Sequence, residues 1–206
     1  MRSGEGITHL FFDVGGVLGT DAWDREQRAL ATTRFGLDAA ELEERHAEAV
    51  GALEAGAMTL DEYLAAAVFH RPRPFGRDAF KAFIRELSVP HPDAIALARE
   101  LGGTGRYVLM TLNNESAELN VYRLRRFGLL ECFVAFFSSC WVGAVKPARR
   151  IYETALAVAQ VEPSRAVFID DRERNLEPAR ALGMRGLLYR GAAPLRTELA
   201  AMGISA

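Results

Sequence analysis

The chain has 206 residues, half of them hydrophobic and a quarter charged, which is the composition of an ordinary globular protein. Its 25 basic and 27 acidic residues give a formal net charge of −2, so the charge balance favours neither nucleic acid nor a membrane as a partner. The hydrophobic run at residues 7–12 is too short for a signal peptide or a membrane span, and we expect a cytoplasmic protein.

The first predicted element is a strand over residues 7–12. This stretch is short and mainly hydrophobic and closes with LFF, which is typical of a buried strand in a parallel sheet. It ends at Asp13, and the glycine-rich loop VGGVLGT follows. We expect the chemistry of the protein to lie in this loop, because ligands of parallel sheets bind beyond the carboxyl ends of the strands.

Residues 21–88 have a helical pattern and no run of β-branched residues. Breaks at Gly36, at Gly56 and at the HRPRPFG segment divide them into four predicted helices. Thr59 and Glu62 have the spacing of a capping box at the start of one helix. We therefore predict an inserted helical domain at 21–88 and a core domain formed by 1–20 and 89–206.

After Pro90 the pattern changes to a regular alternation of helices and strands. Helices are expected over residues 92–101, 116–127, 147–159, 173–182 and 194–202, and strands over 107–112, 133–137, 166–169 and 186–189. Such alternation predicts right-handed crossovers and a mostly parallel sheet covered on both faces. The fold class is therefore α/β, with a doubly wound sheet.

Polar side chains follow four of the predicted strands. A polar residue after a strand is usually a turn former or a helix cap, but these four ends fall on the same edge of a parallel sheet. Carboxylates and an ammonium gathered there need a cation and an anionic ligand to balance their charges. The residues are Asp13, Asn113 with Asn114, Lys146, and Asp170 with Asp171.

The order of these segments resembles the four motifs of the haloacid dehalogenase-like hydrolase superfamily. They read FFDVGGVL, LMTLNNES, VKP and VFIDDRERN, and together they span nearly the whole core. The helical insertion lies where that superfamily places its small cap. The resemblance implies a Rossmann-like core with an inserted cap domain, and a hydrolase that depends on Mg²⁺.

The resemblance also implies roles for individual residues. Asp13 is expected to attack phosphorus and form an aspartyl-phosphate, while Lys146 neutralises Asp13 and the phosphoryl oxygens. Mg²⁺ is expected on Asp13, the backbone carbonyl of Gly15 and Asp171, with Asp170 close by or acting through water.

Further roles concern the substrate and the surroundings of the carboxylates. Asn113 is expected to donate a hydrogen bond to a phosphoryl oxygen, and Asn114 and Gly15 to contact the substrate. Asn175 either orients the groups near Asp171 or caps the following helix.

Two positions depart from the family pattern. Phosphatases of the superfamily usually carry a second Asp two residues after the nucleophile, as general acid and base, and this chain has Gly15 there. Loss of such a group commonly costs about 10² to 10⁴ in rate. The second motif usually ends in Ser or Thr, where we place Asn113; Thr111 is the alternative if the register differs by two residues.

We therefore expect a phosphatase that removes phosphate from a small phosphorylated metabolite, slowed or made selective for good leaving groups by Gly15. One alternative is a catalytically degenerate protein that kept the pocket for binding or regulation. Another is a 2-haloacid dehalogenase, which also lacks the second Asp but needs no metal, so the pair Asp170 and Asp171 argues against it. The sequence names neither the substrate nor the oligomeric state.

Other residues have plainer interpretations. The histidines show no spacing typical of a metal site, and the two cysteines are expected to be reduced thiols. Arg123, Arg125 and Arg126 are interpreted as a solvated helix face. Trp23 either lines the mouth of the substrate site or packs where the insertion joins the core. The histidines are His9, His46, His70 and His91, and the cysteines Cys132 and Cys140.

Overall fold

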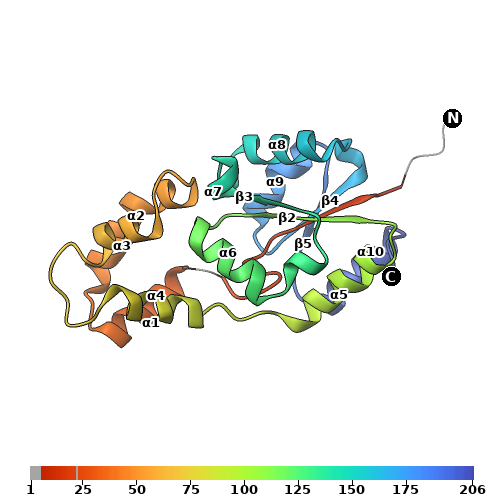
Figure 1. Cartoon of the computed structure of the whole chain (residues 1–206). Helices are drawn as coiled ribbons and strands as arrows, with labels where there is room; N and C mark the ends of the chain where they lie inside the picture. The colour runs from red at the N-terminus through yellow and green to blue at the C-terminus, as the bar shows by residue number, and fades with distance from the viewer. Residues whose placement is uncertain (1–5, 22) are drawn as a thin grey trace.

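The computed structural model describes residues 6–21 and 23–206, and this part of the chain contains a parallel sheet of five strands (Figure 1). The strand order is β3-β2-β1-β4-β5, so the chain runs outward from the central strand in one direction and then returns to the other side. This confirms the doubly wound sheet. The strands are β1 (His9–Phe12), β2 (Val108–Asn113), β3 (Ala135–Ser138), β4 (Ala166–Asp170) and β5 (Arg185–Leu188).

Helices cover both faces of the sheet, as Figure 1 shows. Leu10 and Phe12 of β1 enter one hydrophobic cluster and Phe11 enters the other, because successive side chains of a strand point to opposite faces. The first face is covered by α5 (Pro92–Gly103), α6 (Ala117–Arg126) and α10 (Ala192–Ala201), and the second by α8 (Arg149–Ala159) and α9 (Glu173–Ala181).

Three short elements were not predicted, since a single turn carries no periodic signal. They are α7 (Ser139–Val142), η1 (Leu129–Glu131) and η2 (Pro163–Arg165). None of the helices in the described part of the chain is both long and apolar enough to cross a membrane.

The insertion between β1 and α5 is helical, and its four helices agree with the sequence prediction. Gly36 ends the first of them with a left-handed φ of 62°, and the predicted capping box of Thr59 and Glu62 opens the third. The four helices are α1 (Arg25–Phe35), α2 (Ala39–Glu54), α3 (Leu60–Ala67) and α4 (Arg77–Glu86).

The insertion has a hydrophobic cluster of its own. Phe80 lies at its centre, with its ring centroid 5.7 Å from that of Trp23 and 4.8 Å from that of Phe35. Leu119 of α6 also enters this cluster, so the core contributes one side chain to it. Packing therefore separates the insertion from the sheet, and its exact limits as a domain at residues 21 and 88 stay a prediction.

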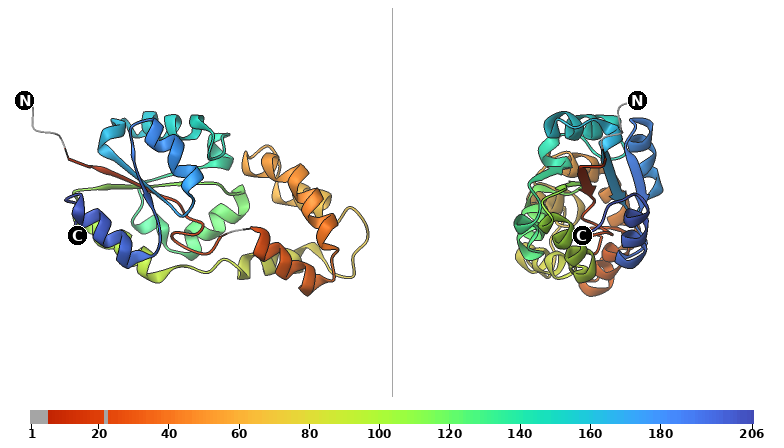
Figure 2. Two further views of the ribbon diagram at one scale, coloured as in Figure 1. Left: turned by 180° about the vertical axis from the view of Figure 1, so that it is seen from behind. Right: turned by 90° about the vertical axis from the view of Figure 1, so that its right-hand side faces the viewer.

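The turn after α2 rests against α7 of the core. Gly56 has a φ of 73°, and a Cβ atom there would lie 2.1 Å from the carbonyl oxygen of Cys140. No side chain fits at that distance. The insertion and the edge of the core therefore meet through their backbones at this point, beside the end of α2. The left view of Figure 2 shows the insertion at one end of the sheet.

We predict that Gly56→Ala destabilises the protein by at least about 2 kcal/mol, because the substitution adds left-handed strain and a clash with the Cys140 backbone. The matched control is Gly51→Ala in α2, where a Cβ atom meets nothing within 4 Å. This control should stabilise the protein by about 0.5 to 1 kcal/mol. Urea unfolding measures the free energy of unfolding of both variants. A Gly56→Ala variant that is as stable as the Gly51→Ala variant would contradict the contact.

Candidate active site

Lys146 joins two carboxylates at the carboxyl edge of the sheet. Its Nζ lies 2.9 Å from Oδ1 of Asp13, which follows β1, and 2.7 Å from Oδ2 of Asp170, which ends β4. All three residues are buried, with Lys146 4% exposed. The backbone N–H of Val14 donates a further bond of 2.7 Å to Asp13 Oδ1. The structure thus brings together the predicted nucleophile and the predicted lysine.

Burial shapes the charges of this group. It raises the pKa of Asp13 to about 8, assisted by the neighbouring carboxylates Asp170 and Asp171 and opposed by Lys146. For Lys146, burial acts to lower the pKa, but Asp13 and Asp170 outweigh it and raise the pKa above its usual value. An additional cation beside these carboxylates would favour the ionised form of Asp13.

Asp171 completes a cluster of three carboxylates. One oxygen of each of Asp13, Asp170 and Asp171 lies within 4.8 Å of the others. Asp171 Oδ1 is buried and has no hydrogen-bond partner in the described part of the chain. Burial, Asp21 and Asp170 also raise the pKa of Asp171. A buried oxygen without a partner, beside two further carboxylates, fits a hard divalent cation such as Mg²⁺.

Gly16 permits the approach of the loop to this cluster. Its φ is 73°, and a Cβ atom at this position would lie 2.4 Å from Cγ of Asp171. Gly16, the second glycine of the VGGVLGT loop, is therefore required because the carboxylate of Asp171, 155 positions later in the chain, lies where its side chain would be.

Two asparagines hold the charged residues in place. Asn114 binds the backbone of Lys146 twice: its Nδ2 donates to the carbonyl at 3.0 Å, and its Oδ1 accepts from the N–H at 2.8 Å. Asn175 Nδ2 donates to both oxygens of Asp170, at 3.0 and 3.1 Å. Asn175 thus orients the carboxylate cluster, and α9 has no side-chain cap at its start. Of the two roles considered for Asn175, orientation agrees with the structure.

Asn113 makes its side-chain hydrogen bonds within the core. Its Nδ2 donates to Asn120 at 3.1 Å, and its Oδ1 accepts from the Ser138 hydroxyl at 3.0 Å, in a buried network. The alternative, Thr111, is fully buried within β2. The amide of Asn113 is thus engaged within the core, whereas the hydroxyl of Thr111 has no hydrogen-bond partner in the described part of the chain. Neither residue lines the cavity described below, so a contact of either with a phosphoryl oxygen stays a prediction.

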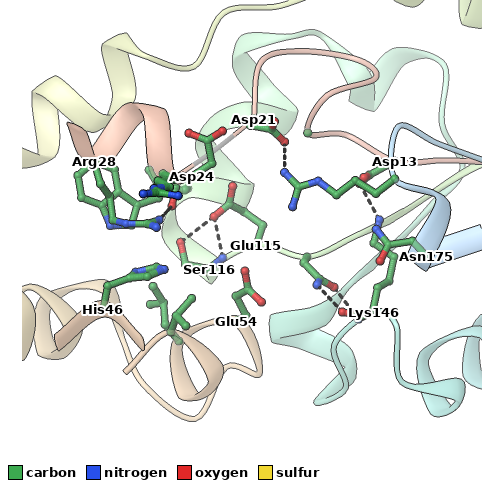
Figure 3. A pocket seen from close by; sticks show the side chains of 18 of the residues that line it. Asp13, Asp21, Asp24, Arg28, His46, Glu54, Glu115, Ser116, Lys146 and Asn175 are labelled. Atoms are coloured by element: carbon green, nitrogen blue, oxygen red, sulfur yellow. Dashed lines mark hydrogen bonds and ion pairs between the residues drawn. The ribbon is translucent and has the colours of Figure 1, made fainter. Parts of the chain in front are cut away.

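A cavity of about 460 Å³ lies between the core and the insertion. Figure 3 shows Asp13, Lys146 and Asn175 at one end, His46 and Arg28 at the other, and Glu54, Glu115 and Ser116 between them. Gly15 and Asn114 line the cavity as predicted, and so does Trp23, which also packs in the hydrophobic cluster of the insertion. Trp23 therefore packs in the insertion as considered, and its place at a substrate mouth stays a prediction.

Gly15 has no carboxylate, and most other carboxylates in the cavity are engaged. Asp21 pairs with Arg172 at 2.8 Å, Asp24 caps α1, and Glu115 accepts from the backbone of Ser116 and pairs with Arg123. Glu54, at the end of α2, makes no hydrogen bond or ion pair within residues 6–21 and 23–206. Burial and the Glu115 carboxylate raise its pKa.

Arg123 was interpreted as part of a solvated helix face, and this is wrong. The side chain is 1% exposed and lies 3.4 Å from Glu115, and it also donates to the backbone carbonyl of Thr20. It links α6 to the loop that leads into the insertion. Arg125 and Arg126 are exposed, as expected.

Comparison with known proteins agrees with this geometry. The sequence model of the haloacid dehalogenase-like hydrolase family matches residues 7–183. A bifunctional epoxide hydrolase 2 of Rattus norvegicus is 31% identical over 115 residues, which are 56% of this chain and 21% of that protein. A sesquiterpene phosphatase of Aspergillus oryzae is 30% identical over 114 residues, 54% of this chain and 58% of that protein. The match thus spans less than two thirds of either relative.

A solved structure extends the likeness to the fold. A HAD family enzyme of Bacteroides thetaiotaomicron, in complex with magnesium and inorganic phosphate, superposes with a TM-score of 0.73 at 20% identity. The superposition covers 90% of this chain and 95% of that one. Since the family's sequence model matches from β1 to the end of α9, and the fold agrees, this chain belongs to the haloacid dehalogenase-like hydrolase family.

Proposed function

We propose that this hydrolase is a Mg²⁺-dependent phosphatase that acts on a small phosphorylated metabolite through an aspartyl-phosphate on Asp13. The observation that carries the proposal is the buried Lys146 ammonium between Asp13 and Asp170, beside an Asp171 oxygen without a partner. This arrangement has a nucleophile, a fixed positive charge and a place for a cation within one cavity. The relative named as a phosphatase and the solved structure with magnesium and phosphate support it.

The proposed reaction has two steps. In the first, an Asp13 oxygen forms a bond to phosphorus while the bond from phosphorus to the leaving oxygen breaks. In the second, a water oxygen forms a bond to phosphorus while the bond from phosphorus to the Asp13 oxygen breaks, which releases inorganic phosphate and restores the Asp13 carboxylate. The proton that the water loses passes to solvent and balances the one that the leaving oxygen takes up. Lys146 offsets the charge of Asp13, so that an anionic phosphoryl group can approach it.

Mg²⁺ would be held by Asp13, the Gly15 carbonyl and Asp171, with Asp170 beside it, and would supply positive charge to the phosphoryl oxygens. Asp170 contributes through its neighbours, because its oxygens accept hydrogen bonds from Lys146, Asn175 and the backbone of Arg172. Asn114 and Gly15, which line the cavity, are the proposed substrate contacts near the phosphoryl group.

Gly15 determines which esters react well. As the bond to the leaving oxygen breaks, that oxygen gains negative charge, and Gly15 has no proton to give it. Leaving oxygens that tolerate charge, as in aryl phosphates, acyl phosphates and sugar 1-phosphates, should therefore be preferred over primary alkyl phosphates.

We predict that the purified protein hydrolyses an aryl phosphate with added Mg²⁺ and loses this activity when the metal is chelated. Asp13→Asn should lower kcat/KM by at least about 1000-fold, because an amide is not a nucleophile for this reaction. The matched control, Asp78→Asn on the exposed start of α4, should keep wild-type kinetics. Absence of turnover in the wild type would favour a degenerate binding protein, and metal-independent release of halide from a 2-haloacid would favour a dehalogenase.

A second prediction concerns the loop beside Asp171. Gly16→Ala should weaken Mg²⁺ binding at least about 10-fold, since the added methyl group displaces the Asp171 carboxylate. Gly105→Ala is the control, because Gly105 has a similar φ of 66° and open space around its Cβ position. Calorimetric titration with Mg²⁺ measures both variants. If Gly16→Ala binds the metal as well as Gly105→Ala does, Asp171 is not a ligand.

A third prediction concerns the missing proton donor. Gly15→Asp should raise kcat/KM for primary alkyl phosphates by about 100-fold and leave kcat/KM for aryl phosphates nearly unchanged. The value of kcat/KM should then depend less steeply on the pKa of the leaving group. Gly15 is not among the glycines with a positive φ, so its φ angle does not disfavour an L-residue. Gly15→Asn is the control of equal size without a transferable proton.

Rates over a series of leaving groups, measured for the wild type and both Gly15 variants, test this account. The same dependence on leaving-group pKa in all three proteins would show that another group supplies the proton. Glu54, the carboxyl group without a partner in the cavity, would then be the first candidate.

A further inference from the structure

Three side chains of the insertion form a hydrogen-bonded chain that ends at the cavity. Nε1 of Trp23 lies 2.6 Å from the hydroxyl oxygen of Tyr63, and this oxygen lies 2.8 Å from Nδ1 of His46. Trp23 precedes α1, His46 belongs to α2 and Tyr63 to α3, so the chain connects three segments. Tyr63 is fully buried and Trp23 nearly so.

The direction of these hydrogen bonds follows from the chemistry of the groups. An indole N–H can only donate, so the Tyr63 oxygen accepts from Trp23. The Tyr63 hydroxyl hydrogen then needs an acceptor, and Nδ1 of His46 is the one within reach in the described part of the chain. The reverse arrangement would leave a buried hydroxyl hydrogen without an acceptor, which is unfavourable. Nδ1 of His46 is therefore unprotonated.

The imidazole of His46 is also neutral. Burial and the nearby Arg28 lower its pKa to about 4, against the opposing effect of Glu43. A neutral imidazole carries one N–H, and since Nδ1 is the acceptor, the proton is on Nε2. Trp23 and Tyr63 thereby fix the tautomer of His46.

Nε2 of His46 is open to the cavity. It has no hydrogen-bond partner among residues 6–21 and 23–206, yet it is not among their buried polar atoms that lack one, so solvent reaches it. His46 lines the cavity at the end opposite Asp13 and Lys146 (Figure 3). The site therefore offers a fixed N–H donor far from the reacting phosphoryl group.

The other lining groups characterise a ligand for that donor. Trp23, Leu53, Leu60 and Leu119 contribute buried apolar surface to the same cavity. Arg28 lies beside His46 (Figure 3), but its guanidinium is already paired with Glu43 and bound to the carbonyl of Trp23, so it is not free for an anion. Glu54 and Glu115 lie between His46 and Asp13, and Arg25 and Arg174 also line the cavity. An uncharged organic group with an apolar body and an acceptor oxygen agrees with the apolar lining and with an Arg28 that is already paired.

We infer that His46 determines substrate specificity by donating its Nε2–H to a neutral oxygen on the leaving-group end of the substrate. This inference rests on the proposed phosphatase function. The substrate class is then a phosphate monoester of an uncharged alcohol or phenol that has an apolar body and a carbonyl, ether or hydroxyl oxygen remote from the phosphate.

The first test observes the tautomer by NMR of protein labelled with ¹⁵N in its histidines, and it needs no turnover. The expected result at neutral pH is an unprotonated Nδ1 and a protonated Nε2 for His46, assigned by its loss in His46→Gln. Tyr63→Phe removes the hydroxyl that binds Nδ1 and should mix the two tautomers. An imidazolium, or a proton on Nδ1 in the wild type, would overturn the inference.

The second test compares two aryl phosphates of equal leaving-group pKa, one with a remote carbonyl oxygen and one without it. The wild type should have a KM about 10-fold lower for the carbonyl compound, which is the typical net value of one hydrogen bond. His46→Leu should abolish this preference, whereas His46→Gln, whose amide N–H lies near the place of Nε2, should restore part of it. Equal preference in the wild type and His46→Leu would overturn the inference.

A third experiment distinguishes a protein that is not a phosphatase from a phosphatase in which His46 does not select the substrate. The two free phenols, without phosphate, are titrated into the labelled protein, and the Nε2–H resonance of His46 should shift with the carbonyl phenol alone. If the protein binds this phenol at His46 but hydrolyses neither ester, the proposed phosphatase function is wrong, whereas the binding site at His46 is confirmed. If the protein hydrolyses both esters but its His46 resonance responds equally to both phenols, the phosphatase function holds and the inference about His46 is wrong.

Discussion

The structure of the site depends on one buried ammonium between two buried carboxylates. Lys146 contacts Asp13 and Asp170 at 2.9 and 2.7 Å, and removal of one partner from such a group commonly costs about 3 to 5 kcal/mol. The contacts require the ends of β1 and β4 to be neighbours, which the order of the sheet provides. Asn114 then fixes the backbone of Lys146 from the end of β2. The sheet thus brings three distant segments into one charged group.

The insertion adds a second end to the cavity, with different chemistry. Near the sheet the lining consists of the Asp13 and Lys146 charges, whereas around His46 it combines apolar side chains, the fixed N–H donor and an Arg28 already paired with Glu43. Gly56 brings the turn after α2 against the backbone of Cys140 and so holds this helix over the core. In this account the core performs the reaction and the insertion selects the leaving group, a division that allows specificity to change without disturbing the carboxylates.

The sequence predicted the elements and the charged residues well, because strands that end in polar residues leave a clear pattern. Asp13, Lys146, Asp170 and Asp171 were found in this way, and they do lie together. The place of Asn113 was not predictable, since its partners Asn120 and Ser138 come from other elements. His46 was set aside for lack of metal spacing. Its proposed role depends on Tyr63, 17 residues away, and no local pattern indicates a fixed tautomer.

The covalent intermediate tests the central claim most directly. The protein is mixed with Mg²⁺ and an aryl phosphate, quenched in acid at successive times, digested, and its peptides are examined by mass spectrometry. The account predicts one phosphoryl group on the peptide that contains Asp13, formed before phosphate is released and absent from Asp13→Asn. A phosphoryl group on another residue, or full turnover by Asp13→Asn, would contradict it.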